Sequence, residues 1–509
     1  MYFAQSLLII TYFIPVVLLL IFAGNLYFMI LLYLRTLHRG RDEATSLNRR
    51  FHEQYSEEDL PLIATQLPVY NECNVVERAI RAIAAMDYPL DRHEIQVLDD
   101  SNDETCTIID RVAAELLSKG HRIHVIRRSN REGYKAGALE NGLRHTEAEF
   151  IALFDADFVP PGDFLRRMIP ILLLRRDVGF AQARWGHLDG DQNWLTKIQC
   201  IGLDGHFGIE QPARAWNSCF MNFNGTAGLW RREAIHAGGG WEHDTLTEDM
   251  DLSYRAQLKG WKPFFVSDLA VPAEVPGNIN AFKSQQFRWA KGSIQTAIKL
   301  LPRVIRSGAS PLAKIQAVFH MTHYLTHPLL LMMIMLALPV LLFTPFREKP
   351  VLIWLFVSIV ATGTLAPITL YITSQRVLYP GNKRARLRNM PLLTLVGIGM
   401  TLSNTCAVIE AIMGRSSEFV RTPKQGQTSI RHYACKGTTA AVVELGIGVY
   451  CYISMFLYLT TAKAIVTPFL FLYATGFTLV GLVTLRDTLV GSRKQVEEVK
   501  PDAEPVSIM

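Results

Sequence analysis

The chain has 509 residues, of which 49% are hydrophobic, and a formal net charge of +6 at pH 7. This charge does not indicate a nucleic-acid partner, because the basic residues cluster beside long apolar runs, as they do at the cytosolic side of membrane proteins. The seven cysteines form no C-x-x-C pair, which disfavours a disulfide framework or a zinc site and fits a reducing cytosolic environment.

The N-terminal segment is strongly apolar. Residues 1–34 contain no charged side chain, and the run 7–34 is long enough to cross a membrane. It has no basic start and no clear small-residue cleavage site, so a spanning helix is favoured over a secretory signal. The five arginines of segment 35–50 predict that the end of this helix lies in the cytosol and that the N-terminus lies outside.

Residues 35–285 have the composition of one soluble domain. Apolar runs at 62–69, 94–98, 122–127 and 149–154 each lead into acidic or turn residues, with helix-compatible stretches between them. This alternation predicts a mainly parallel sheet with helices on both faces. Ligands of such sheets bind beyond the carboxyl ends of the strands, which is where the acidic residues fall.

Asp155 and Asp157 lie one residue apart at the end of a predicted strand. Two carboxylates in this spacing can share a hard divalent cation that also binds a diphosphate, although D-x-D is common in loops without a metal. Asp99 and Asp100 end another strand, and the pattern alone fits either ligand binding or helix capping. The sequence contains neither G-x-G-x-x-G nor G-x-x-x-x-G-K-[ST], which disfavours a dinucleotide oxidoreductase and a P-loop ATPase.

A third acidic cluster is Thr247-Glu248-Asp249. It fits the start of a helix with Thr247 as the cap and the acids in the first turn, an arrangement that still allows Asp249 to face a cleft. The segment 223–228, FNGTAG, predicts a loop with a close backbone approach rather than the interior of a helix or strand.

The segment 284–292, SQQFRWAKG, lies directly before the membrane region and carries Gln285, Arg288 and Trp289. In the following stretch, 291–306, basic residues repeat at helical spacing beside an apolar face. This pattern predicts an amphipathic helix on the lipid headgroups, with an ordinary surface helix as the alternative.

Four further apolar runs are long enough to span a membrane: 315–343, 351–374, 438–461 and 464–485. The basic segments 376–390 and 415–436 are expected in the cytosol. Segment 391–414 lies between them, so it predicts an interfacial or re-entrant helix, with a sixth span as the alternative. Glu444 is expected either to line a polar path or to lie near a hydrated helix end.

Taken in order, these motifs resemble those of the processive family 2 glycosyltransferases, which include cellulose, chitin and hyaluronan synthases. Six sequence segments are most similar to the plant mannan and glucomannan synthase branch of the cellulose synthase-like superfamily. They are LPVYNE, IQVLDDS, NREGYKAGAL, FNGTAGLWR, EDMDL and QQFRW. At the position of Phe287 that branch typically has histidine, so the motif does not determine which polysaccharide is the product.

The resemblance implies an α/β GT-A (Rossmann-like) glycosyltransferase domain in the cytosol, an α-helical transmembrane region and an inverting mechanism. A UDP- or GDP-sugar would be the donor, with Mg²⁺ or Mn²⁺ as the cofactor. The acceptor would be a growing glycan or a membrane lipid, and accessory export subunits would be further partners. The expected place is the plasma or inner membrane.

The resemblance also assigns roles. The family's donor nucleotide site corresponds to Asp99, Asp100, Lys135 and Asp155, and its metal site to Asp155 and Asp157. Its catalytic base corresponds to Asp249. Its acceptor and diphosphate contacts correspond to Gln285, Arg288, Trp289, Asn224 and Glu248. Segment 419–426, FVRTPKQG, resembles imperfectly the gating loop of cellulose synthases, with Thr422 and Lys424 near the diphosphate. A plain basic cytosolic loop is the alternative.

Elementary chemistry agrees with these roles. A diphosphate leaving group needs neutralisation by a cation such as Arg288, one carboxylate suffices as the base of an inverting displacement, and the apolar face of a sugar ring stacks on a tryptophan.

These observations predict a β-glycan polymerase that also translocates its product. The alternatives are a transferase that adds one sugar to a ceramide- or polyprenyl-type lipid, and an inactive transporter or scaffold, which the complete set of acids disfavours. The predicted segments are a transmembrane helix (1–34), the glycosyltransferase domain (35–285), the acceptor motif and interfacial helix (286–310), two transmembrane helices (311–375), the interfacial helix and gating-like loop (376–436), two transmembrane helices (437–486) and a disordered tail (487–509).

Overall fold

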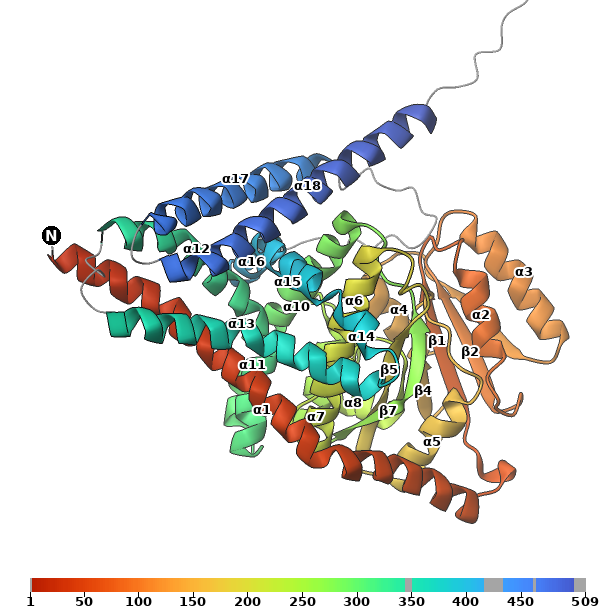
Figure 1. Ribbon diagram of the computed structural model, residues 1–509. Coiled ribbons are helices and arrows are strands. Elements are labelled where there is room, and N and C mark those ends of the chain that lie inside the picture. Colours follow the sequence, from red (N-terminus) through yellow and green to blue (C-terminus); the bar gives the residue numbers. More distant parts are fainter. Residues whose placement is uncertain (1, 344–349, 416–433, 461–463, 499–509) are drawn as a thin grey trace, which may run out of the picture.

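The computed structural model describes residues 2–343, 350–415, 434–460 and 464–498, and the structural statements below concern these residues. Figure 1 shows a sheet with its covering helices on one side of the molecule and a group of long helices on the other. We refer to these two parts as the sheet domain and the helical region.

The sheet domain is built on seven strands in the order β3-β2-β1-β4-β6-β5-β7. They are β1 (Ile63–Val69), β2 (His93–Asp99), β3 (Arg122–Arg127), β4 (Phe150–Leu153), β5 (Val178–His187), β6 (Gly228–Arg231) and β7 (Lys262–Ala273). The first four strands are parallel to one another, as predicted, and β5 is parallel to β7. Strand β6 runs antiparallel to both β4 and β5, which makes the sheet mixed.

Helices cover both faces of this sheet. One face packs on α2 (Val76–Ala84), α3 (Thr105–Ser118) and α5 (Phe164–Leu174), and the other on α4 (Tyr134–Leu143), α8 (Arg232–Gly238) and α9 (Glu248–Leu258). Strands β1, β2 and β4 are therefore almost entirely buried, which explains their continuous apolar sequences. The predicted α/β class is confirmed.

The helical region contains long apolar helices. Among the residues that the structure describes, four segments are long and apolar enough to cross a membrane: Phe3–Phe51, Pro311–Phe343, Thr438–Leu459 and Ala464–Val490. Four of the five predicted spans coincide with them. The fifth, 351–374, lies within α13 (Pro350–Leu378), which is not among the four.

The segment predicted to be re-entrant is bent. It consists of α15 (Met390–Gly399) and α16 (Thr401–Ile412). The helical stretch Lys383–Gly399, which ends with α15, is bent by 41° against Thr401–Ile412. This geometry fits a re-entrant segment and a broken span equally, so the predicted return to the cytosolic side stays a prediction.

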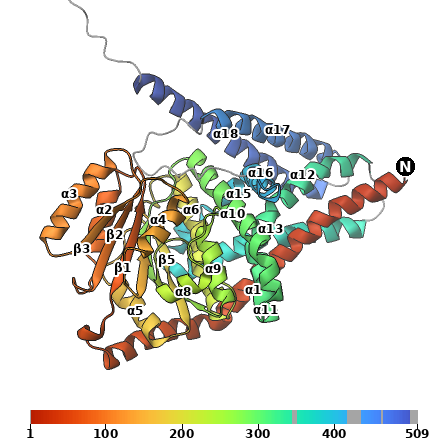
Figure 2. The ribbon, with the colours of Figure 1, turned by 180° about the vertical axis from the view of Figure 1, so that it is seen from behind.

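The first helix, α1 (Tyr2–Gln54), runs past the end of the apolar segment without a break. Figures 1 and 2 show it passing along the helical region and then beneath the sheet domain. Ala44, Leu47 and Phe51 are buried in the core of that domain, which explains why the helix continues beyond its arginines.

Helix α10 (Ile279–Arg306) joins the two parts, and it contains both the Gln285-x-x-Arg288-Trp289 motif and the predicted amphipathic stretch. The expectation that its basic residues face lipid headgroups is wrong for Lys291 and Lys299. Lys291 is fully buried against Glu410, and Lys299 pairs with three carboxylates of the sheet domain. Arg303 and Arg306 are exposed, and their contact with headgroups stays a prediction.

Candidate active site

The carboxyl ends of β1, β2 and β4 open on a cleft of about 360 Å³. Ten of the predicted residues line it: Asp100, Lys135, Asp155, Asp157, Asn224, Glu248, Asp249, Gln285, Arg288 and Trp289. Asp99 does not line the cleft, and Thr422 and Lys424 lie outside the described residues. Side chains that are far apart in the sequence therefore meet in one cleft.

Asp99 and Asp100 point in different directions. Asp99 is the last residue of β2 and is buried, with its Oδ2 2.8 Å from Arg127 Nε. Asp100 follows the strand and reaches the cleft, where Arg128 Nε donates to its Oδ1 at 3.0 Å. Since successive side chains of a strand alternate, only one of two adjacent acids can face the ligand. The structure gives that place to Asp100.

Lys135 bridges the two acidic walls of the cleft. Its ammonium lies 2.6 Å from Asp155 Oδ1 and 3.9 Å from Glu248 Oε1, and it donates to the Gly225 carbonyl at 3.0 Å. Burial disfavours the charged form, but Asp155 and Glu248 outweigh it and raise the pKa of Lys135. Lys135 is therefore a cation at neutral pH, held at the first turn of α4.

Gly225 allows the FNGTAG loop to pass close to these charges. Its φ is +77°, and a Cβ there would lie 2.9 Å from Asp249 Oδ2 and 3.3 Å from Lys135 Nζ. A larger residue would be strained by the backbone angle and would push against both groups. The segment is a loop up to Gly228, which begins β6.

Asp249 lies in the first turn of α9, between the cleft and a second cavity described below. Its Oδ1 accepts a hydrogen bond from Met250 N at 2.7 Å. Burial and the neighbouring Glu248 raise the pKa of Asp249 to about 7, against the lowering effect of Lys135. The helix starts here as predicted, but Thr247 does not cap it through its side chain, because its hydroxyl bonds Thr296 at 3.1 Å.

The cleft is suited to a divalent cation. Its lining contains seven carboxylates (Glu72, Asp100, Asp155, Asp157, Glu248, Asp249, Glu274) and three basic side chains (Arg131, Lys135, Arg288). An anionic diphosphate would be repelled by this excess of carboxylates unless a cation entered with it. Oxygen ligands from Asp155 and Asp157 are the type that Mg²⁺ and Mn²⁺ prefer.

The Gln285-x-x-Arg288-Trp289 motif lies along α10 on the far wall of the cleft. The Trp289 ring is 6.4 Å from that of Trp185, with the two planes inclined at 59°. These two indoles and Gln285 form a wall that is both apolar and able to form hydrogen bonds, which suits a sugar ring.

A second cavity, of about 650 Å³, extends from this wall among the helices. It is lined by residues of α1, α6 (Trp194–Gly205), α10, α12 (Thr326–Phe343), α13, α15, α16 and α18 (Thr467–Glu498). Seven residues line both cavities: Trp185, Leu203, Asn224, Thr247, Asp249, Gln285 and Trp289. The two cavities therefore meet at Asp249 and Trp289.

Sequence reasoning missed polar residues at this junction. His206 and Glu210 are the first and last residues of a single π-helical turn, and both line the second cavity. His206 Nδ1 lies 3.1 Å from Glu210 Oε2. Asn224 Nδ2 lies 3.3 Å from His206 Nε2. The spacing of four residues is ordinary for a helical pair, so the sequence carried no signal of a role.

Comparisons with known proteins agree with the fold. Residues 61–292 match the family described as "Glycosyltransferase like family 2". The chain is 42% identical over 251 residues to glucomannan 4-beta-mannosyltransferase 1 of Oryza sativa subsp. japonica, a match that covers 48% of each chain. It is 32% identical over 486 residues to probable glucomannan 4-beta-mannosyltransferase 15 of Arabidopsis thaliana, with 91% of this chain and 87% of the relative covered.

Among solved structures, the chain is similar to mannosyltransferase PcManGT from Pyrobaculum calidifontis, solved in complex with GDP-Man and Mn²⁺. The sequence identity is 18% and the TM-score 0.49, and the match covers 78% of this chain and all of the other. The match to the rice relative spans about half of that protein's length.

Proposed function

The chain belongs to glycosyltransferase family 2, in the cellulose synthase-like superfamily with the plant glucomannan mannosyltransferases, and from this premise we propose that it is a membrane-embedded polymerase. It joins sugars from a nucleotide-sugar donor into a β-linked glucan, mannan or glucomannan. The observation that carries this proposal is the junction of the two cavities at Asp249 and Trp289, because a chain extended at the cleft has a ready path among the helices.

The donor would bind at the carboxyl ends of the strands. We assign the nucleotide end to Asp100, with Asp99 acting through Arg127 behind it rather than on the ligand. Asp155 and Asp157 would hold Mg²⁺ or Mn²⁺, which when bound neutralises the diphosphate as it leaves. Lys135 and Arg288 add fixed positive charge on the same leaving group.

Transfer would be a single displacement at the anomeric carbon. The acceptor hydroxyl loses its proton to Asp249 as its oxygen bonds that carbon, and the bond to the diphosphate breaks on the opposite side, so the configuration inverts. A carboxylate with a pKa near the working pH is suited to this role, and Asp249 has that property because it is buried beside Glu248. Glu248 and Asn224 lie beside it to orient the acceptor and the diphosphate.

The acceptor end would rest on Trp289 and Gln285. After each addition the new end moves over this wall and the older sugars enter the second cavity, which is how a polymerase would also translocate its product. Polar groups such as His206, Glu210 and Asn404 line that cavity and can bond sugar hydroxyls. The predicted segment roles, including a gating-like loop within 376–436, are part of this proposal.

A lipid acceptor is a second candidate, and one observation favours it. The wall of the second cavity formed by α1 is apolar except for Asn25, with Val16, Leu19, Leu20 and Phe22 among its residues. A lipid tail would fit there while its head lay at Trp289. In that case the enzyme would add one sugar and release the product.

Both the reaction and the orientation can be tested in sealed membrane vesicles. Nucleotide sugars do not cross membranes, so a cytosolic active site is reached only in inside-out vesicles. We expect nucleotide release from GDP-mannose or UDP-glucose with Mg²⁺ or Mn²⁺, in inside-out vesicles and not in right-side-out ones until detergent is added. Release in neither preparation, with a full panel of UDP- and GDP-sugars, would rule out the transferase.

A further inference from the structure

Helix α10 carries lysines at positions 283, 291 and 299, eight residues apart. Eight residues of α-helix advance about 12 Å and turn the side chain by about 80° from one lysine to the next. The three ammonium groups therefore reach different neighbours. Each contacts a carboxylate from another part of the fold, and the first two lie on either side of the Gln285-x-x-Arg288-Trp289 motif.

The first two lysines connect α10 to the helical region. Lys283 Nζ lies 2.6 and 2.8 Å from the two oxygens of Glu444 on α17 (Ala434–Leu459) and 2.6 Å from Thr484 Oγ1 on α18. Lys291 Nζ lies 2.9 Å from Glu410 Oε2 on α16. Glu444 lines neither cavity, so its role differs from both sequence expectations: it anchors α10.

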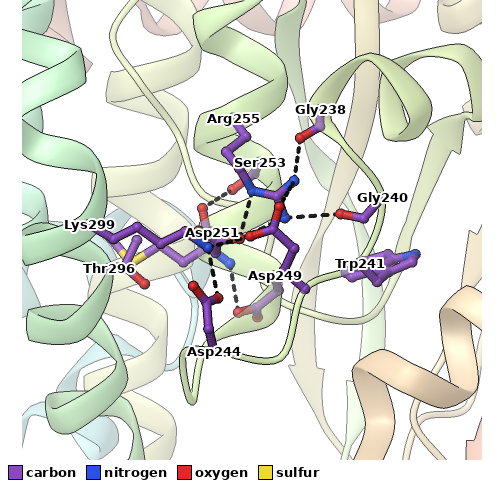
Figure 3. A network of polar contacts seen from close by, with 12 residues as sticks. Gly238, Gly240, Trp241, Asp244, Asp249, Asp251, Ser253, Arg255, Thr296 and Lys299 are labelled. Atoms are coloured by element: carbon purple, nitrogen blue, oxygen red, sulfur yellow. Dashed lines mark hydrogen bonds and ion pairs between the residues drawn. The ribbon is translucent and has the colours of Figure 1, made fainter. Parts of the chain in front are cut away.

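The third lysine connects α10 to the helix that carries Asp249. Figure 3 shows Lys299 reaching across to the acidic side chains around the start of α9. Its Nζ lies 2.6 Å from Glu242 Oε2, 2.7 Å from Asp244 Oδ1 and 3.0 Å from Asp251 Oδ1. These three acids are close enough together to hold a metal ion, and the Lys299 ammonium lies within 3.0 Å of one oxygen of each.

The acids held by Lys299 are also fixed from the other side. Arg255 Nε donates to Asp251 Oδ2 at 2.7 Å and its guanidinium donates to the carbonyls of Gly238 and Gly240. Asp251 is fully buried and lies two residues after Asp249. The start of α9 is thus tied to α10 by Lys299 and, through Arg255 of α9 itself, to the backbone at Gly238 and Gly240.

Contacts beside Lys299 hold the same junction. Gln295 Oε1 accepts from Leu246 N at 3.0 Å, and Thr296 bonds Thr247. A Cβ on Gly292 would lie 2.6 Å from Thr247 Cγ2, so α10 touches the Thr247-Glu248-Asp249 segment with nothing in between. Any shift of α10 would therefore move the segment that carries Asp249.

We propose that these three lysines are positioning residues, and that α10 fixes the acceptor wall in register with Asp249 on one side and with the membrane cavity on the other. This inference rests on the proposed function. Lys299 would set the distance between the acceptor hydroxyl and Asp249. Lys283 and Lys291 would align the same wall with the path of the product.

A role in stability and a role in register predict different results when these pairs are replaced. Replacing both partners of a buried ion pair with apolar residues is often neutral for stability, whereas removing one partner leaves an unpaired charge. A pair that serves only stability is therefore replaceable, and a pair that fixes register is not. The double variant described below uses this difference on the membrane side. For Lys299, whose removal would leave three acids without their cation, the test compares a neutral substitution with one that keeps the charge.

The test compares Lys299→Met and Lys299→Arg with the wild-type protein in detergent. For Lys299→Met we expect transfer to fall on the order of 10- to 100-fold, as for a misplaced acceptor, with nucleotide affinity by calorimetry within about twofold. Hydrogen–deuterium exchange should become faster at residues 245–252. Lys299→Arg keeps the charge and should stay close to the wild type in all three measurements.

The membrane side is tested with Lys283→Met combined with Glu444→Leu, which removes both charges. We expect normal nucleotide affinity and shorter product chains. Four results would each overturn the inference. Three concern Lys299→Met: wild-type transfer, a parallel loss of transfer and nucleotide affinity, or unchanged exchange at residues 245–252. The fourth is full-length product chains from the double variant. Exchange needs no substrate, so it shows whether Lys299 holds residues 245–252 in place even if the wild-type protein transfers no sugar and the proposed function fails.

Discussion

Replacing Asp249 with asparagine should lower sugar transfer on the order of 10²–10⁴-fold, the range for loss of a positioned general base, while nucleotide binding persists. Asparagine keeps the shape of aspartate, and its oxygen can still accept from Met250 N, as Asp249 Oδ1 does at 2.7 Å. It cannot take the proton of the acceptor hydroxyl. Calorimetric titration with nucleotide beside turnover of the same preparation separates the two effects.

The matched control is Glu233→Gln, which removes a carboxylate from the exposed face of α8 away from the cleft. It should behave as the wild type in both measurements. An Asp249→Asn protein with near-normal turnover would show that another group accepts the proton.

Replacing Asp157 with asparagine should have a different signature, in which metal-dependent nucleotide affinity and turnover fall together. The change removes one charge and one oxygen ligand from the proposed cation site. Mutating a group that only hydrogen-bonds to a metal ligand typically costs on the order of 10–100-fold in metal affinity. We expect a loss of at least that size when Asp157, a proposed ligand itself, is replaced. Nucleotide titrations with and without Mn²⁺ measure the metal-dependent part.

Asp163→Asn is the control for this variant, since Asp163 is an exposed aspartate at the start of α5 that does not line the cleft. The assignment of base and metal ligand is reversed if Asp249→Asn abolishes nucleotide binding and Asp157→Asn leaves it intact. The two variants therefore test the division of roles as well as each role.

The sequence predicted the strands that are flanked by clear turn residues. Strands β1 to β4 were found because each is a short apolar run that ends in acidic or turn residues, and β1, β2 and β4 are also buried almost throughout. Strand β6, of four residues, has no such signal, and its antiparallel direction depends on the path of the chain after β5. The mixed character of the sheet therefore required the structure.

The sequence predicted which residues form most of the site, but not all of their orientations and contacts. The difference between Asp99 and Asp100 follows from strand alternation and was open to prediction. The partners of Lys291 and Lys299 could not be predicted from the sequence, because basic residues at helical spacing give the same pattern whether they face lipid or buried acids. Glu410, for example, lies 119 residues from Lys291 in the sequence.

The structure of the enzyme stalled during synthesis tests the central claim most directly. Electron cryo-microscopy of the protein in lipid nanodiscs, incubated with Mn²⁺ and the donor identified in vesicles, would show what occupies the second cavity. We predict a continuous chain of sugar density that begins at Trp289 and runs between α1, α12 and α13. A cavity that holds a lipid with a single sugar at Trp289 would contradict the polymerase and favour transfer to a lipid.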